Sequence, residues 1–294
     1  MPLSTQQAYR YCQDSSNKHY ENFPVASLLL PARLRKPISA IYTFARMADD
    51  FADEGELPDQ ERIDLLKQAE TDLLNAAKGQ TNDLPVYIAL ADVLRETPDL
   101  LEPLLQLLSA FTMDVHKQRY ADIGEVMGYC RYSANPIGRM LLILYGAAST
   151  RNIAYSDAVC SALQIINFLQ DIRSDYLERD RIYMPQAELQ RFNLTETDLN
   201  GESTHPQLHA FMNFQTQRAL TLLQSGAPLG LRLRGRTGLE LRMMILGGWK
   251  VLEKVHKNGD QLSKTARLRK RDWLWIGTHA LGSRFKVYSK KLYN

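Results

Sequence analysis

Cysteine is scarce in this 294-residue sequence, which contains only Cys12, Cys130 and Cys160 and no CxxC pair. An odd number of widely spaced cysteines argues against a disulfide framework or a zinc site and fits a reducing compartment. The polar N-terminal segment also lacks the charged and then apolar order of a signal peptide, so no export is indicated. We therefore expect a cytoplasmic protein.

Long apolar runs are missing as well. The longest, MLLILYGAA at residues 140–148, has about half of the roughly 20 residues that cross a bilayer, and it predicts a buried helix. The six histidines show no HxxxH spacing, and neither a Ser/His/Asp nor a Cys/His arrangement is evident. The sequence therefore gives no sign of a membrane span, a histidine metal site or a nucleophilic triad.

Helical periodicity is what the sequence does have. Apolar residues recur three and four positions apart almost everywhere, as in Ile38, Ile41, Tyr42 and Ala45, whereas strand-like alternation is nearly absent. Turn signals at 24–37, 55–59, 79–85, 98, 121–124, 149–155, 183–204 and 226–238 indicate about nine helices. The sequence predicts an all-α helical bundle that forms a single domain over residues 1–294.

A first acidic stripe lies in the segment IYTFARMADDFADE. Two like-charged pairs are spaced four residues apart, Asp49 with Asp53 and Asp50 with Glu54. Such pairs are mildly unfavourable on a helix and are usually only solvated. Here, however, Arg46 and Tyr42 continue the line within a helix that otherwise has core character, which indicates a functional face.

A second stripe occupies the segment ALQIINFLQDIRSDY, which is apolar around most of its circumference and therefore predicts a buried helix. One side of it carries Gln164, Asn167, Asp171 and Asp175. Carboxylates in a core cost several kcal/mol each unless they are paired or bind metal, so this line should meet partners or a wet cavity. The alternative is a structural salt-bridge network with Arg173, Arg179 or Arg181.

Magnesium fits both stripes. Mg²⁺ prefers oxygen ligands and usually shares its coordination shell with water and substrate phosphates, so two facing carboxylate stripes could hold a diphosphate through metal. Arg179 and Arg181 could add charge-assisted contacts to the same group. The expected chemistry is metal-assisted loss of a leaving group.

Four ordered segments resemble the squalene and phytoene synthase family: HYENF (19–23), YTFARMADDFAD (42–53), YCRYSANPIG (129–138) and QIINFLQDIRSDYLERDRIYMP (164–185). The resemblance covers most of the chain. It implies an α-helical bundle of the isoprenoid synthase type, with a central cavity between two aspartate-rich helices. It also implies that two or three Mg²⁺ ions bind with a prenyl diphosphate substrate.

The resemblance and the chemistry of the side chains together suggest roles for individual residues. The metal ligands would be Asp49, Asp50, Asp53, Asn167, Asp171 and Asp175. The catalytic residues would be Tyr42, Arg46, Tyr129, Asn135 and Gln164, with Asn135 a candidate to position a water molecule. The substrate contacts would be Asn22, Phe23, Phe51, Phe168, Arg179, Arg181 and Trp249. The aromatic rings among them could stabilise a carbocation by roughly 0.5 to 2 kcal/mol each, or they could simply fill the core.

Departures from the family pattern narrow the expected reaction. Glu21 and Gln170 stand where the family usually has cations, and Gly248 stands in place of a late cavity tyrosine. Together with ENFPVASLLLP (21–31) and YSANPIGR (132–139), these departures resemble the hydroxysqualene synthase branch of bacterial hopanoid biosynthesis. That branch takes one substrate, presqualene diphosphate, and captures the cation with water, so no nicotinamide cofactor is expected.

Three other interpretations stay open. The chain could condense two prenyl diphosphates, as a squalene, dehydrosqualene, phytoene or presqualene diphosphate synthase. It could be a non-catalytic binding or assembly factor that keeps the prenyl-synthase bundle, although both acidic stripes argue against this. It could also be an all-α, magnesium-dependent nucleotide pyrophosphatase, but those usually carry several glutamate-rich pairs.

The C-terminal segment is basic: residues 261–294 carry nine Lys or Arg residues and one acid. A helix through it would group Trp273, Ile276, Ala280 and Leu281 on one side. The hypothesis is a reversible, peripheral contact of residues 264–291 with anionic lipid at the inner membrane. The alternative is a face packed on the bundle, with solvated cations, and we expect no nucleic-acid partner.

Overall fold

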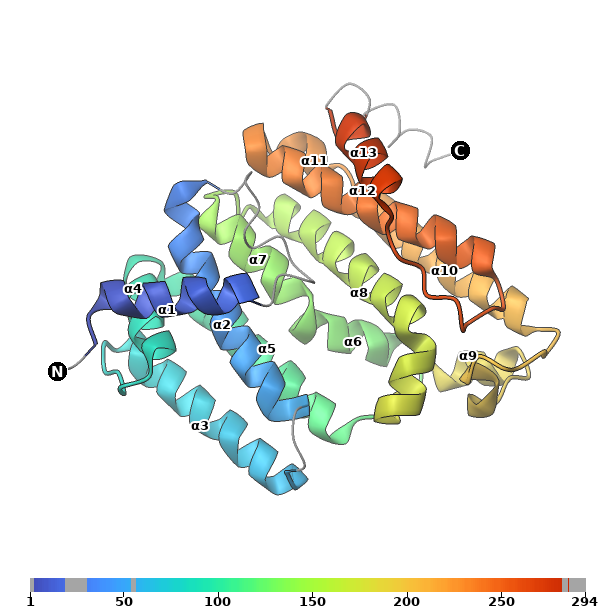
Figure 1. The fold of residues 1–294 in the computed structure, drawn as a ribbon, viewed down its shortest axis with the longest axis horizontal. Coiled ribbons are helices and arrows are strands. Elements are labelled where there is room, and N and C mark those ends of the chain that lie inside the picture. The colour runs from blue at the N-terminus through green and yellow to red at the C-terminus, as the bar shows by residue number, and fades with distance from the viewer. Residues whose placement is uncertain (1–2, 19–30, 54–56, 282–284, 286–294) are drawn as a thin grey trace. The chain divides into compact units, whose positions relative to one another are not determined.

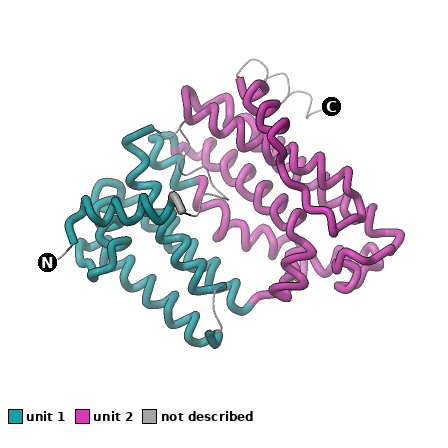
Figure 2. Tube along the Cα trace, viewed as in Figure 1, with its two compact units in different colours: residues 1–116, 139–147 teal, residues 117–138, 148–294 magenta. Residues whose placement is uncertain are grey.

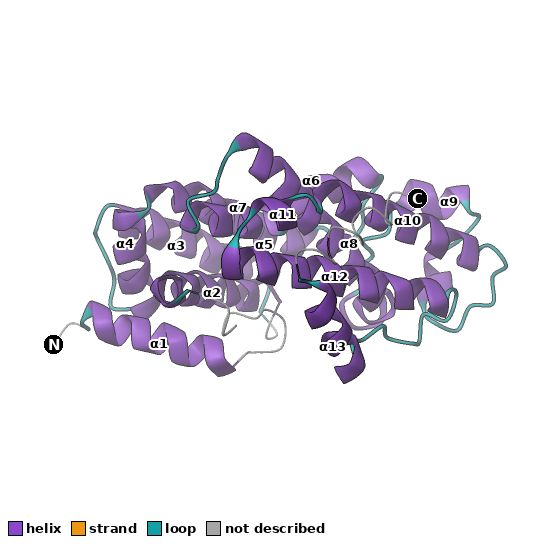
Figure 3. Cartoon of the chain, turned by 90° about the horizontal axis from the view of Figure 1, so that it is seen from above, coloured by secondary structure: helices purple, strands orange, loops and turns teal. Residues whose placement is uncertain are grey.

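The computed structural model describes residues 3–18, 31–53, 57–281 and 285. Within these residues every regular element is a helix and no strand forms (Figure 3), apart from a single parallel bridge between Arg119 and Ile182. The all-α prediction is therefore confirmed. The α-helices (Figure 1) are α1 (Thr5–Lys18), α2 (Ala32–Asp53), α3 (Asp59–Ala77), α4 (Pro85–Glu96), α5 (Leu101–His116), α6 (Ile123–Ser133), α7 (Asn135–Leu144), α8 (Thr150–Arg179), α9 (Gln186–Arg191), α10 (Leu208–Gly226), α11 (Leu229–Arg232), α12 (Gly235–Asn258) and α13 (Lys270–His279). The 3₁₀-helices are η1 (Pro98–Leu100) and η2 (Glu196–Leu199).

The chain divides into two compact units (Figure 2). The first comprises Met1–His116 and Arg139–Ala147, and the second comprises Lys117–Gly138 and Ala148–Asn294. The first acidic stripe, on α2, belongs to the first unit, and the second stripe, on α8, belongs to the second. A single domain over residues 1–294 stays a prediction.

In the first unit, α2 packs against α1, α3, α4 and α5. Its buried residues include Ile41, Phe44 and Ala48, which recur at helical spacing, and the Phe44 ring meets the Tyr87 ring edge-on at 6.2 Å. Burying such a side chain contributes roughly 1.5–3 kcal/mol. Because these residues fix one side of α2 in the core, the polar stripe lies on the less buried side of the helix.

In the second unit, the 30-residue helix α8 packs against α6, α10 and α12. Asp180 ends α8 in the left-handed conformation, with φ 50°. The Arg119 guanidinium donates hydrogen bonds to the Asp180 carbonyl and to its carboxylate, at 2.6 Å for the latter, and to the Glu196 carboxylate at 2.8 and 2.9 Å. This arginine also lowers the pKa of Glu196. The ionic contacts hold the end of α8 that carries the second acidic stripe.

The expected number of about nine helices is too low, since the described residues alone contain thirteen α-helices. One reason is that the break expected over 183–204 contains helical turns: α9 and η2 lie within it, and each buries a leucine, Leu189 and Leu199. The break expected over 24–37 is also too long, because α2 begins at Ala32 and continues through Pro37. The proline removes one backbone hydrogen bond near the start of the helix, a loss that the packing of α2 outweighs.

The expected grouping of the C-terminal apolar residues on one side of a helix is wrong. Ile276 and Ala280 are fully buried, whereas Trp273 and Leu281 are 53% and 55% exposed. The face proposed from the sequence is therefore divided between the core and the solvent. Within the part of the chain that the structure describes, no helix has both the length and the apolar character needed to span a membrane.

Candidate active site

The acidic stripe on α2 forms a charged cluster at the boundary between core and solvent. Arg46 makes ion pairs with Asp49 at 3.4 Å and with Asp50 at 2.7 Å, and all three side chains are partly exposed. Burial raises the pKa of Tyr42, and the charges of Asp49 and Asp50 raise it further, whereas Arg46 opposes the shift. Tyr42 and Arg46 thus lie beside the carboxylates as predicted, while Glu54 lies outside the described residues.

The polar line on α8 has the burial pattern that the sequence predicts. Ile165, Ile166, Phe168, Leu169 and Ile172 are buried. Among the polar residues, Asn167 is exposed, and Gln164, Asp171 and Asp175 are partly buried. The carboxylates therefore lie along the margin of a buried helix, within reach of an added ligand, and their roles remain predictions.

Asp171 is the carboxylate most affected by its surroundings. Burial raises its pKa, and the charges of Arg267 and Arg179 partly oppose that shift. Arg267 belongs to the segment between α12 and α13, and the Gln170 side-chain amide donates a hydrogen bond of 2.6 Å to the Ala266 carbonyl in the same segment. Gln170 thus fastens a distant stretch of chain beside the second stripe. Sequence reasoning missed Arg267, because nothing local in KTARLRKR indicates a partner 96 positions earlier.

The two predicted arginines after the stripe differ in their exposure to solvent. Arg179 is exposed in the last turn of α8, whereas Arg181 is buried and its backbone N–H donates to the Asp175 carbonyl at 2.9 Å. Arg173, the third arginine of the alternative salt-bridge network, donates from Nε to the Asn200 carbonyl at 3.0 Å. The charge of Arg179 therefore acts on Asp171, while Arg173 fastens the loop after η2.

A cluster of four aromatic rings brings together two predicted residues, Tyr129 and Phe168, and two that the sequence did not indicate, Tyr120 and Tyr183. Tyr183 stacks on Phe168 with ring centroids 3.8 Å apart, and Tyr129 lies 6.1 Å from Phe168 and 5.6 Å from Tyr183. Tyr120 completes the group, 5.7 Å from Tyr129. Their electron-rich faces are suited to stabilising a nearby cation.

The other predicted rings are distributed differently. Trp249 stacks on Trp275 of α13 at 5.6 Å, with the Lys250 ammonium 4.9 Å from the Trp249 ring centre, and so belongs to a second aromatic cluster. Phe51 is partly buried on α2. Asn22 and Phe23 lie outside the described residues. Within the second unit, the predicted rings therefore fall into two clusters, one with Phe168 and Tyr129 and one with Trp249.

Two further positions acquire packing roles. The side chain of Asn135 is buried, and its Oδ1 accepts a hydrogen bond of 2.9 Å from Ser161 Oγ, which fixes the amide against α8. At Gly248 an added Cβ would lie 2.6 Å from Leu163 Cδ2 and 3.3 Å from Ile166 Cδ1. This glycine therefore lets α12 approach α8 closely, and a larger residue would require these side chains to move.

The donor atoms on both stripes fit magnesium, because they are carboxylate and amide oxygens. Among the described residues, no three His, Cys, Asp or Glu side chains are grouped closely enough to hold a metal ion by themselves. Where Mg²⁺ binds with few protein ligands, water and substrate phosphate usually complete its shell. Metal binding by these residues stays a prediction.

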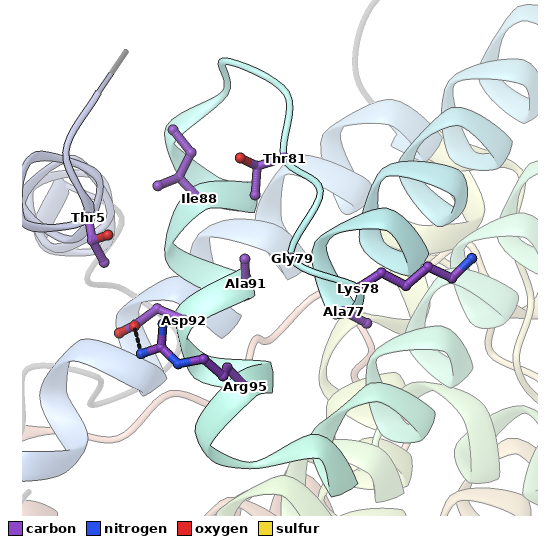
Figure 4. Close-up of a pocket in the computed structure, with 9 residues that line it drawn as sticks. All are labelled: Thr5, Ala77, Lys78, Gly79, Thr81, Ile88, Ala91, Asp92 and Arg95. Carbon is purple, nitrogen blue, oxygen red and sulfur yellow. Dashed lines mark hydrogen bonds and ion pairs between the residues drawn. The ribbon is translucent and has the colours of Figure 1, made fainter.

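A pocket of about 450 Å³ in the first unit contains none of the predicted site residues (Figure 4). It is lined by Lys78, Thr81 and Ile88 among others, and by an ion pair of 2.5 Å between Asp92 and Arg95. Asp92 also accepts a hydrogen bond from the Tyr9 hydroxyl at 2.9 Å. Because none of the predicted catalytic, substrate or metal residues lines it, the pocket is not the candidate active site.

The squalene/phytoene synthase family model matches residues 16–273. The chain belongs to the squalene/phytoene synthase family. It is 36% identical to the hydroxysqualene synthase of Rhodopseudomonas palustris, over 90% of this chain and 88% of that protein. It is 34% identical to the phytoene synthase of Mycobacterium tuberculosis, over 78% of this chain and 74% of that protein. A solved squalene synthase from Alicyclobacillus acidocaldarius superposes with a TM-score of 0.81 at 32% identity, covering 88% of this chain and 97% of that one.

Membership of the squalene/phytoene synthase family confirms two predictions. The resemblance drawn from four short segments is correct, and so is the expectation of an enzyme of this family. The helical fold is the one found in a solved member. The relatives named above carry different reactions in their names, so membership defines the class of enzyme and leaves the individual reaction to be proposed.

Proposed function

We propose that this squalene/phytoene synthase family member converts presqualene diphosphate to hydroxysqualene and releases diphosphate. The observation that carries the proposal is the 36% identity with a hydroxysqualene synthase over 90% of the chain. A feature of the site supports it. Gln170, which replaces a cation usual in the family, is neutral and donates to the Ala266 carbonyl, so it offers no charge to a second diphosphate.

In this proposal, the carboxylates of each acidic stripe would hold the Mg²⁺ ions that bind the diphosphate of the substrate. Asp49, Asp50 and Asp53 on α2 and Asn167, Asp171 and Asp175 on α8 would hold the ions. Bound Mg²⁺ would neutralise the charge that develops on the departing diphosphate. Arg179 and Arg267, whose charges both act on Asp171, add positive charge at the same end of α8.

Departure of the diphosphate leaves a carbocation that the protein must shield. The C–O bond breaks with its electron pair on the diphosphate, and the cyclopropylcarbinyl cation rearranges beside the ring faces of Tyr129, Phe168 and Tyr183. Water then forms the new C–O bond, and its proton passes to solvent or to the released diphosphate. Asn135, whose amide is fixed by Ser161, positions that water. No nicotinamide cofactor takes part.

A substrate comparison tests the proposal. Purified protein is supplied with Mg²⁺ and either presqualene diphosphate or farnesyl diphosphate, without a nicotinamide cofactor, and diphosphate release and lipid products are followed. We expect fast conversion of presqualene diphosphate and poor conversion of farnesyl diphosphate. Efficient use of farnesyl diphosphate would refute the one-substrate proposal.

Condensation of two prenyl diphosphates is the second candidate function. It is favoured by the 34% identity with a phytoene synthase and by the similarity to a solved squalene synthase. The two candidates differ in stoichiometry, because condensation to a hydrocarbon releases two diphosphates per product, whereas conversion of presqualene diphosphate releases one. The same assay therefore separates them.

A further inference from the structure

Helix α13 exposes a continuous apolar face. Trp273 and Leu274 are 53% and 73% exposed, and Lys270 and Gly277 lie on the same side of the helix; Leu281, two residues after the helix ends, is 55% exposed. The four helical residues follow the spacing i, i+3, i+4 and i+7, which places them along one side of the helix. Single exposed leucines are common on protein surfaces, but three large apolar side chains on and directly after one short helix indicate an interaction site.

The opposite side of α13 is firmly attached to α12. Ile276 is fully buried, the Asp272 carboxylate makes a 2.5 Å ion pair with Lys254, and Trp275 stacks on Trp249. The Lys250 ammonium lies 4.3 Å from the centre of the Trp275 ring. Because these contacts fix the rotation of the helix, Trp273 and Leu274 cannot turn inward without breaking them. The outer face is presented on a rigid support.

The surroundings of this face are cationic. Lys264, Arg267, Arg269, Lys270 and Arg271 are all exposed. Between residues 261 and 281 the only acid is Asp272, and it is buried in its ion pair with Lys254. The exposed surface of this stretch thus combines large apolar side chains with positive charge and presents no exposed carboxylate.

We propose that the outer face of α13 docks on the surface of an anionic lipid bilayer. Trp273, Leu274 and Leu281 enter the interfacial region, and Lys270 and Arg271 contact lipid phosphates. Three features favour a bilayer over a protein partner: a tryptophan beside aliphatic side chains, cations around the apolar strip, and a helix only ten residues long that can lie in the interface. Binding of this kind is peripheral and reversible, and it does not depend on the proposed reaction.

Vesicle co-sedimentation of the full chain tests the proposal. The probes are phosphatidylcholine vesicles with and without phosphatidylglycerol, at low and high salt. We expect binding to require the anionic lipid and to weaken as salt rises. The double variant Lys270→Gln/Arg271→Gln should weaken binding roughly thirtyfold, the loss expected from two near-surface cations. The variant Trp273→Ser/Leu274→Ser should also weaken binding and should leave the unfolding temperature unchanged.

Matched controls come from the first unit. Lys67→Gln/Lys78→Gln removes two exposed lysines, and Tyr11→Ser/Leu84→Ser removes two apolar side chains that are 53% and 50% exposed. Both controls should bind vesicles like the unmodified chain. Tryptophan fluorescence should be quenched by lipids brominated on the acyl chain, and Trp273→Phe should abolish most of that quenching.

Two outcomes would overturn the proposal. One is vesicle binding that the α13 variants leave unchanged, or no binding to anionic vesicles at all. The other is that sedimentation velocity shows a dimer that Trp273→Ser/Leu274→Ser converts to a monomer, because the face would then be covered by a second copy of the chain.

Discussion

Asp171 lies where its charged form lowers the stability of the folded protein. Its side chain lies at the edge of a buried helix, and burial raises its pKa because the charged form loses hydration. Arg267 and Arg179 offset only part of this cost. A carboxylate held in such a place is suited to an added cation, which is the use that we propose for it.

Replacing Asp171 should therefore separate activity from stability. Asp171→Asn should lower turnover by at least about 100-fold, since loss even of groups that support a metal ligand costs 10–100-fold. In metal-free buffer at neutral pH, the same variant should unfold at a higher temperature than the wild type. A raised pKa means that the wild type is destabilised as pH rises through it, so the difference should vanish below the ordinary carboxyl value of 3.8. Wild-type turnover in Asp171→Asn would contradict the assignment.

Arg267 offers a second test at the residue scale. Its charge acts on Asp171, whereas the exposed Arg269, two positions later, is not among the charges that shift the pKa of Asp171. We expect Arg267→Gln to raise the KM for the diphosphate substrate about tenfold, the effect of one lost charge-assisted contact. Arg269→Gln is the matched control and should leave KM unchanged when assayed without vesicles. Equal effects of the two variants would show that general charge, rather than position, is responsible.

Among the helices, the contact between α8 and α12 supports α8, the helix that carries the second acidic stripe. Gly248 allows that contact, because any Cβ would overlap Leu163. Gly248→Ala should lower the free energy of unfolding by less than about 1 kcal/mol, because the added Cβ displaces only the movable end of the Leu163 side chain and alanine has the better helix propensity. Gly128→Ala on α6, where an added Cβ meets nothing within 4 Å, should instead stabilise by roughly 0.5–1 kcal/mol. Urea unfolding of both variants measures the contrast.

The docking of α13 on α12 should depend on pH. The Lys254 ammonium and the Arg269 backbone N–H hold the pKa of Asp272 below its usual range. A lowered pKa contributes stability above the ordinary value of 3.8, and that stability is lost as pH falls through the native pKa. Asp272→Asn should therefore accelerate amide exchange in α13 at neutral pH by about fivefold, equivalent to about 1 kcal/mol. Equal exchange in the two proteins at neutral pH would show that the ion pair does not support α13.

At the scale of the whole molecule, features that follow from a local sequence pattern could be predicted. Features that depend on contacts between residues far apart in the sequence could not. Helical spacing in α2 and α8 identified the buried faces and the polar lines, because 3.6-residue periodicity is a local property. The nearness of Arg267 to Asp171, and of Tyr183 and Tyr120 to Phe168 and Tyr129, depends on tertiary packing that no short segment encodes.

The C-terminal helix illustrates the same limit. Its sequence identifies an amphipathic, basic segment, but which of its apolar residues are buried depends on the orientation in which α12 holds it. Asp272 and Trp275 supply that orientation through Lys254 and Trp249. The roles of Asn22 and Phe23 stay predictions, since both lie outside the described residues.

The central claim is that the chain ionises one prenyl diphosphate and captures the resulting cation with water. The most direct measurement is product analysis by mass spectrometry after conversion of presqualene diphosphate in water enriched in heavy oxygen, with Mg²⁺ and no nicotinamide cofactor. We predict a thirty-carbon alcohol that carries the heavy isotope in its hydroxyl group and one diphosphate released for each alcohol. A hydrocarbon product, or an alcohol without the heavy isotope, would contradict the account.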